Sequence, residues 1–133
     1  MSRTLALDYG RARCGCALAD PTGTVVTPIP VVERPATRRG LAALASVVAE
    51  NDVGRVVVGL PLTLAGEEGV QAAETRAFAE QLSRRIGRTE VDFHDERLTT
   101  AQAAHDRRGA AAEDSRAAAH LLESYLAPTA GAR

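Results

Sequence analysis

Three acidic residues stand in or just past apolar segments of the sequence. Asp8 closes the run "TLALD", Glu96 lies just past the strand segment "EVDFH", between Asp95 and Arg97, and Asp114 opens a helical stripe. The stripe has the spacing i, i+3, i+4, i+7, i+8 and i+11, and its other members are Ala117, Ala118, Leu121, Leu122 and Tyr125. A charge that faces a core needs a partner or a metal ion. These three carboxylates are therefore the candidate catalytic groups.

Carboxylates gathered without basic partners repel one another and raise each other's pKa. A divalent cation relieves that repulsion, and a purely oxygen ligand set suits Mg²⁺ or Mn²⁺ rather than zinc. Such a site is suited to two-metal hydrolysis of a phosphodiester. Local roles remain open for each residue: Asp8 as a turn acceptor, Glu96 as a partner of a surface arginine, and Asp114 as a helix cap.

The elements that must position these residues follow from periodicity. Residues 4–9, 14–20 and 24–32 read as an antiparallel meander, followed by further elements at 37–51 (helix), 55–60 (strand), 70–86 (helix) and 90–94 (strand). A helix is expected from Thr99, which forms a capping box with Gln102, and after an interruption at "RRGAAAED" a last helix at 114–127. The order predicts an α/β domain with a mixed sheet.

Strand alternation assigns side chains to faces of that sheet. Leu5 and Leu7 should lie on one face, with Ala6 and Asp8 on the other. The prolines at 28 and 30 predict that the third strand is an edge strand, since each lacks a ladder donor. Two further predictions concern single positions: Asp20, before "PTG", is a turn residue, and the cysteines at 14 and 16 are core packing residues.

Composition limits the function. The 133 residues fit one domain, and no run approaches the ~20 apolar residues of a membrane span, so a cytoplasmic protein without membrane contact is expected. All 16 basic residues are arginine, and the net charge is −1. That charge gives no global signal for nucleic acid, so a nucleic-acid site requires a local arginine patch beside the acidic centre.

Four segments carry a family resemblance: "LALDYGRARCGCALAD", "VVVGLPLTLAGEEG", "DERLTTAQA" and "DSRAAAHLLESYL". With their spacing they resemble the YqgF/RuvX family, proteins of the RNase H-like superfamily related to the RuvC Holliday junction resolvase and named as pre-16S rRNA nucleases. The resemblance implies an α/β fold of the RNase H-like kind, with a five-stranded mixed sheet flanked by helices. It implies one nuclease domain over 1–133 and Asp8, Glu96 and Asp114 as the metal-binding carboxylates. The last residues, 127–133, are expected to form a frayed tail.

Residues beside these carboxylates are candidates for substrate contact. Arginines commonly bind phosphate, and backbone amides of a loop at a strand end can approach it. A solvated turn, a structural turn and a helix cap are the competing roles for these positions. The candidates are Arg11, Arg13, Gly59, Pro61, Thr63, Gly66, Arg97 and Thr99.

The expected function is a Mg²⁺- or Mn²⁺-dependent endonuclease that processes the 5′ end of pre-16S rRNA, as a monomer or homodimer. One alternative is a nuclease on branched DNA, similar to a Holliday junction resolvase. Another is a non-catalytic nucleic-acid-binding factor in ribosome assembly, favoured by the absence of lysine and by the short "HDRRGAAAE" segment, where the family has a longer basic stretch. An ATP-binding element of the actin-like kind would need a two-lobed cleft, for which 133 residues are too few.

Overall fold

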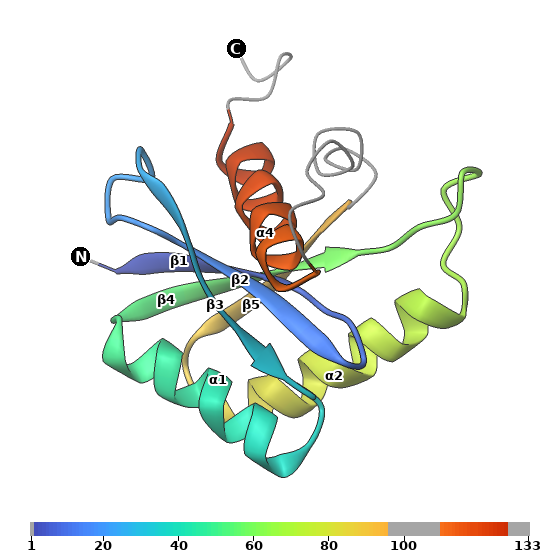
Figure 1. The fold of residues 1–133 in the computed structure, drawn as a ribbon, viewed down its shortest axis with the longest axis horizontal. Helices are drawn as coiled ribbons and strands as arrows, with labels where there is room; N and C mark the ends of the chain where they lie inside the picture. The colour runs from blue at the N-terminus through green and yellow to red at the C-terminus, as the bar shows by residue number, and fades with distance from the viewer. Residues whose placement is uncertain (1, 96–109, 128–133) are drawn as a thin grey trace.

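The computed structural model describes residues 2–95 and 110–127, with side chains in the last helix from Ser115 onward. Its elements are β1 (Arg3–Asp8), β2 (Arg13–Ala19), β3 (Val26–Glu33), α1 (Arg38–Glu50), β4 (Val53–Leu60), α2 (Val70–Ile86), β5 (Glu90–Asp95) and α4 (Ala110–Leu126). The five strands form one sheet in the order β3-β2-β1-β4-β5 (Figure 1). Strands β1, β2 and β3 pair antiparallel, whereas β4 is parallel to β1 and β5. The predicted mixed sheet with an antiparallel meander is confirmed.

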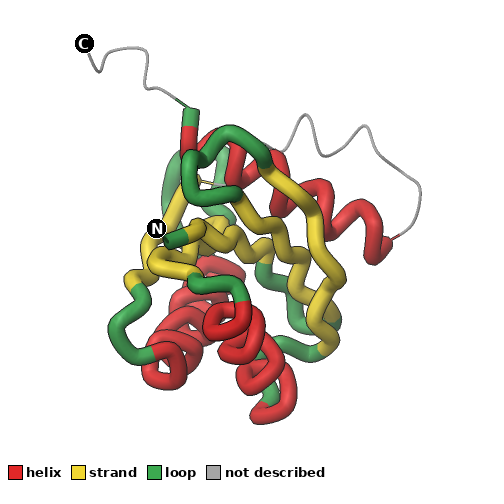
Figure 2. The backbone as a smooth tube through the Cα atoms, turned by 90° about the vertical axis from the view of Figure 1, so that its left-hand side faces the viewer, coloured by secondary structure: helices red, strands yellow, loops and turns green. Residues whose placement is uncertain are grey.

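The sheet lies between two helical layers. Helices α1 and α2 cover one face and α4 covers the other (Figure 2). Leu5 and Leu7 belong to the large core under α1 and α2, together with Phe78. Ala6 packs in a smaller, alanine-rich cluster against Leu122 of α4. The predicted division of β1 into two faces is therefore confirmed, and it places Asp8 on the face that α4 covers.

Several local predictions are confirmed. Strand β3 is an edge strand, where the missing N–H groups of Pro28 and Pro30 cost little. Cys14 and Cys16 are fully buried in the large core, with free thiols. Helix α1 is capped by Thr37, whose side chain accepts the N–H of residue 40 at 3.1 Å.

The last helix differs from its prediction in two ways. It begins at Ala110 instead of 114, because the alanines at 110–112 are strong helix formers and the predicted interruption at "RRGAAAED" does not extend through them. Its buried side includes Ser115 and Ala119 beside Leu121 and Leu122, whereas positions 117 and 125 of the predicted stripe are only half-buried. The hydroxyl of Ser115 finds an acceptor inside, which a hydrophobic pattern does not reveal.

Two predicted features lie outside the described residues: the helix expected from Thr99, and most of the tail expected at 127–133. Within the described parts of the chain, no helix is long and apolar enough to cross a membrane.

Candidate active site

Strands β1, β4 and β5 run in the same direction and end at one end of the sheet, here called the carboxyl end. It is marked by Asp8, Leu60 and Asp95, the last residues of the three strands. Leu7 pairs with Val58, and one residue further along, Gly59 pairs with His94. Asp8 therefore lies at the level where β4 and β5 finish, which is where open α/β sheets bind ligands.

Asp8 is flanked by glycine on both neighbouring strands. On β2 its partner in the register is Gly15, and on β4 the residue at its level is Gly59. Alternation places both glycines on the face that α4 covers, as it does Asp8. A side chain at either position would stand beside the carboxylate. The two neighbouring strands therefore place no Cβ atom beside the carboxylate.

Helix α4 brings its amino-terminal part to the same region. Ser115 is 7% exposed and donates its hydroxyl to the carbonyl oxygen of Ile29 in β3 at 2.8 Å. Ile29 pairs with Cys16, and Cys16 pairs with Leu7, the residue before the candidate carboxylate of β1. The backbone of Asp114, directly before Ser115, therefore belongs to the turn of α4 at this level of the sheet.

The structure thus brings two of the three predicted carboxylate positions to the carboxyl end, Asp8 and Asp114. Glu96 lies outside the described residues and directly follows the last residue of β5. Among the side chains that the structure describes, no group of three histidine, cysteine or acidic residues could hold a metal ion. The carboxylate oxygens of Asp8 are of the hard ligand type that suits a divalent cation such as Mg²⁺ or Mn²⁺.

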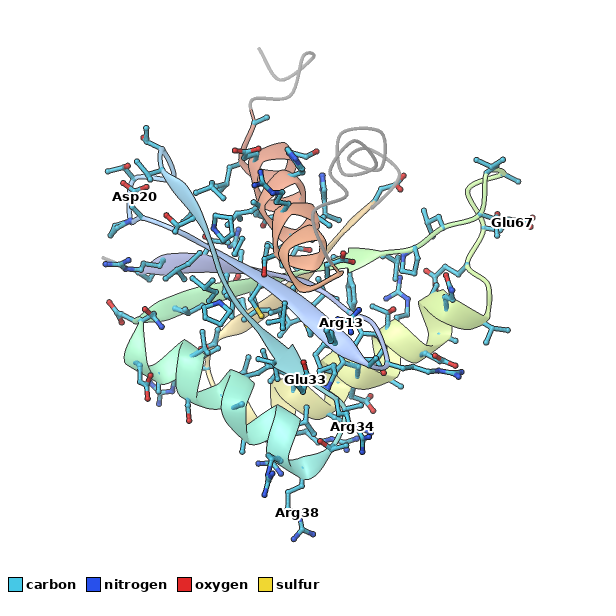
Figure 3. All side chains as sticks on the ribbon, viewed as in Figure 1. Arg13, Asp20, Glu33, Arg34, Arg38 and Glu67 are labelled. Atoms are coloured by element: carbon cyan, nitrogen blue, oxygen red, sulfur yellow. The ribbon has the colours of Figure 1, made fainter. Side chains whose placement is uncertain are left out.

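Arginines from three segments lie at the carboxyl end. The β1–β2 turn carries Arg11, the next strand begins at Arg13, and Arg34 follows β3, donating its backbone N–H to the carbonyl oxygen of Ala12 at 2.9 Å. Arg13 is paired in the register with Glu33. Figure 3 shows Arg13, Glu33 and Arg34 at this end of the meander.

The guanidinium of Arg11 forms a bidentate ion pair with the carboxylate of Glu74 in α2. Its Nε donates to Oε1 at 3.0 Å, and its Nη2 donates to Oε2. The pair raises the pKa of Arg11, and the hydrogen bonds from Arg11 lower the pKa of the Glu74 carboxyl. Both groups are therefore charged at neutral pH. The arginine side chain remains 78% exposed, so a phosphate can reach it.

The loop after β4 is a closed turn. Leu62 and Glu68 form an isolated bridge, the Thr63 N–H donates to the carbonyl of residue 67 at 2.8 Å, and the Gly66 N–H donates to the carbonyl of Thr63 at 2.8 Å. Gly66 has φ = 84°, a conformation that favours glycine. The backbone amides of Thr63 and Gly66 are therefore hydrogen-bonded within the loop. This matches the alternative role for this loop, a structural turn, rather than binding of phosphate through these two amides. Arg97 and Thr99, the other predicted contacts, lie outside the described residues.

A pocket of about 580 Å³ opens beside the turn that follows Asp8. Tyr9, Arg11 and Pro61 line it from the strand ends, and Gln71, Glu74 and Thr75 line it from α2. The sequence predictions included Arg11 and Pro61 but missed Tyr9 and the residues of α2. For Tyr9 its place directly after Asp8 was an available signal. The sequence carries no such signal for Glu74, because its partner Arg11 lies 63 residues away along the chain.

Comparisons with known proteins agree with this geometry. A family model described as "RuvX: Holliday junction resolvase" matches residues 2–128. A protein of Anaeromyxobacter sp. (strain Fw109-5) named "Putative pre-16S rRNA nuclease" is 42% identical over 134 residues, covering 93% of this chain and 96% of the relative. A protein with the same name from Mycobacterium tuberculosis (strain ATCC 25618 / H37Rv) is 39% identical and covers 93% of this chain and 78% of the relative.

Two solved structures share the fold. RuvC of T. thermophilus in complex with a Holliday junction substrate aligns with a TM-score of 0.61 at 13% identity, covering 95% of this chain and 94% of that one. The Fowlpox virus resolvase, in complex with substrate Holliday junction DNA, aligns with a TM-score of 0.57 at 12% identity, covering 93% and 96%. At these identities the similarity is one of fold, and the RNase H-like prediction is confirmed.

Proposed function

This chain belongs to the RuvX family, a family of phosphodiester hydrolases, and we propose that it is a divalent-metal-dependent nuclease that processes the 5′ end of pre-16S rRNA. The observation that carries the proposal is the setting of Asp8. Its carboxylate ends β1 on the α4-covered face, between two glycines and at the level of the turn of α4 that contains Asp114.

In this proposal Asp8, Glu96 and Asp114 hold Mg²⁺ or Mn²⁺. The cation supplies positive charge that offsets the negative charge developing on the phosphodiester during hydrolysis. The residues of the chain orient the substrate: the arginines at the carboxyl end bind the phosphates on either side of the scissile bond. Arg11, Arg13 and Arg34 are candidates for this role because they lie at the carboxyl end, and Arg97 directly follows Glu96 in the sequence.

The preference for RNA rests on the relatives. Those with about 40% identity over nearly the whole chain are named for pre-16S rRNA, whereas the junction resolvases resemble this chain only in fold. Processing of a ribosomal precursor would place the protein in the cytoplasm. A resolvase-like DNA nuclease is the second candidate, because the family model itself is described by that activity.

The experiment compares Asp8→Asn with wild-type protein on a pre-16S rRNA fragment and on a four-way DNA junction, each with Mn²⁺. We expect the wild type to cut the RNA fragment and the variant to lose that activity, because an amide neither carries the charge nor supplies two anionic oxygens to a cation. Asp52→Asn is the matched control: Asp52 is exposed before β4, at the opposite end of the sheet, and its φ of 52° suits asparagine.

Unchanged cleavage by Asp8→Asn would contradict the mechanism. Cleavage of the junction but not the RNA would support the second candidate. Wild-type binding of the RNA without any cleavage, and without binding of Mn²⁺ by calorimetry, would favour the non-catalytic assembly factor.

A further inference from the structure

Tyr9 is an aromatic residue held in place where β1 ends, on the face of the sheet that α1 and α2 cover, opposite to the face of Asp8. It directly follows Asp8, and its ring stacks on Phe78 of α2 with 4.5 Å between the ring centroids and 23° between the planes. Phe78 is 1% exposed and belongs to the large core, so it fixes the position of the tyrosine. Phe78 covers one face of the ring, and Tyr9 lines the pocket beside the β1–β2 turn.

The walls of this pocket combine an aromatic ring with polar groups. The hydroxyl of Thr75 is engaged, since it donates to the carbonyl oxygen of Gln71 at 2.9 Å. The side-chain amide of Gln71 offers both a donor and an acceptor at the wall. The ion pair of Arg11 and Glu74 contributes a basic group to the lining. The volume, about 580 Å³, lies within the range of small-molecule sites.

We propose that this pocket binds one unpaired nucleotide of the substrate strand, with its base stacked on Tyr9 and its phosphate on Arg11. The inference rests on the proposed function and goes further: it makes the substrate class a strand with an unpaired nucleotide near the scissile bond. The side chains of Asp8 and Tyr9 lie on opposite faces of the sheet at the end of β1, so the nucleotide on Tyr9 and the scissile phosphodiester are reached by a strand that crosses this end.

The chemistry of the pocket matches a nucleotide in each part. Aromatic side chains bind bases by stacking, and this contact is available only to a base that is not enclosed in a duplex. An amide at the wall can hydrogen-bond the edge of a base. Arginine provides the planar donor pair that suits a phosphate.

Glu74 acts as a competitor in this arrangement. It holds Arg11 while the pocket is empty, and it places a negative charge where the phosphate would bind. An exposed ion pair of this kind contributes little to stability, so a phosphate can displace the carboxylate from the guanidinium. Removing the charge of Glu74 should therefore strengthen binding, an effect that a purely structural ion pair would not produce.

Binding is tested in EDTA, so that it is separate from cleavage. The chain has two tyrosines and no tryptophan, so in the Tyr125→Phe variant Tyr9 is the only source of tyrosine fluorescence. We expect a short single-stranded RNA to quench this fluorescence by stacking, and the same RNA annealed to its complement to leave it unchanged. A single-stranded DNA of the same sequence shows whether the 2′-hydroxyl contributes.

Variants test the separate contacts by titration of a labelled single-stranded RNA. Tyr9→Leu should weaken binding about tenfold, the change that ~1.4 kcal/mol of lost stacking produces, and Tyr9→Phe should restore it. Glu74→Gln should strengthen binding about two- to fivefold, in line with the worth of an exposed ion pair. Val70→Trp fills the pocket from an exposed position, 75% accessible, and should weaken binding without disturbing the core.

Equal affinity of wild type, Tyr9→Leu and Val70→Trp would overturn the inference, as would equal quenching by single strand and duplex. If Tyr9→Leu fails to fold, Val70→Trp and Glu74→Gln decide. The experiment distinguishes failure of this inference from failure of the proposed function: a chain whose fluorescence single strands quench but that does not cleave would retain the nucleotide pocket and contradict the nuclease activity. Cleavage that depends on Asp8 but is unaffected by the Tyr9, Val70 and Glu74 variants would support the nuclease activity and contradict the nucleotide pocket.

Discussion

Asp8 and Asp20 both stand where a strand of the first hairpin ends, yet their surroundings give them different roles. The carboxylate of Asp20 accepts the N–H groups of Thr24 and Val25 at 2.9 and 3.0 Å and the hydroxyl of Thr22 at 2.8 Å. Its predicted role as a turn residue is confirmed. Asp8 instead lies between two glycines on a covered face of the sheet. Both residues are aspartates, so the difference between a turn acceptor and a candidate metal ligand comes from the groups that surround each carboxylate.

Gly15→Ala tests whether the space beside Asp8 matters. The added methyl group stands next to the carboxylate and should lower Mn²⁺-dependent cleavage about tenfold to hundredfold, the loss that follows a displacement of about 1 Å at a reacting centre. Gly15 does not have a positive φ, so alanine is compatible with its backbone. Cleavage assays and thermal unfolding check this together. A folded variant with wild-type activity would show that the space is not used.

The turn at Asp20 predicts a pH dependence of stability. The hydrogen bond from the Val25 N–H, followed by that from the Thr22 hydroxyl, lowers the pKa of the Asp20 carboxyl in the folded protein. A lowered folded-state pKa stabilises the fold above the unfolded value of about 4. That contribution is lost as the pH falls through the lowered folded-state pKa. Asp20→Asn should therefore reduce the acid dependence of the unfolding temperature, and an identical pH profile would contradict this role.

At the scale of elements, α4 decides the position of the third candidate carboxylate, and it is held at both ends. Near its start, Ser115 bonds to β3. Near its end, the Tyr125 hydroxyl donates to Asp92 of β5 and accepts from Arg55 of β4, each at 2.9 Å. The burial of α4 against the meander therefore positions residue 114 relative to β1, and its docking should influence activity.

Ser115→Ala removes the bond nearest to Asp114. It should lower the free energy of unfolding by about 1 kcal/mol, the usual worth of one hydrogen bond, and reduce cleavage as well. The matched control is Thr37→Ala, which removes the cap of α1 at a similar cost of about 1 kcal/mol but on the opposite face of the sheet. Denaturant unfolding and cleavage rates are measured for both. Equal cleavage by the two variants would show that docking of α4 does not tune the site.

The whole molecule is almost neutral, with a net charge of −1, so binding of nucleic acid must depend on how its charges are distributed. The β1–β2 turn, the start of β2 and the end of β3 bring Arg11, Arg13 and Arg34 to the carboxyl end of the sheet. Helix α2 begins at that end and carries other arginines, Arg84 and Arg85, in its last turn near the start of β5. Arginines at the two ends of the sheet can therefore be compared for their contribution to nucleic-acid binding.

Arg34→Gln should weaken RNA binding evenly across sequences and reduce the slope of log K against log salt concentration by about 1, as expected for one lost phosphate contact. Arg84→Gln is the control, because Arg84 pairs with Glu80 at the far end of α2. Binding is measured over a range of salt concentrations. Equal slopes of log K against log salt concentration for the two variants would show that Arg34 makes no phosphate contact and that the RNA does not bind at this end of the meander.

Local patterns in the sequence determined much of this protein. Period-two alternation placed Asp8 opposite Leu5 and Leu7, prolines marked β3 as an edge strand, and the pattern at 70–86 matched α2 at both ends. Motifs spread along the chain identified the family. These features depend on neighbours within a few residues or on segments whose order is visible in the sequence. The roles of Glu96, Arg97 and Thr99 stay predictions.

The tertiary structure decided which distant residues meet. Strand register brought Gly15 and Gly59 to either side of Asp8, and the packing of α2 against the strand ends placed Glu74 on Arg11. On the buried side of α4, Ser115 makes a polar contact with β3 that a hydrophobic stripe does not encode. The physical reason is common to all three: the free energy of a contact depends on distance in space, and periodicity reports only the face on which a residue lies.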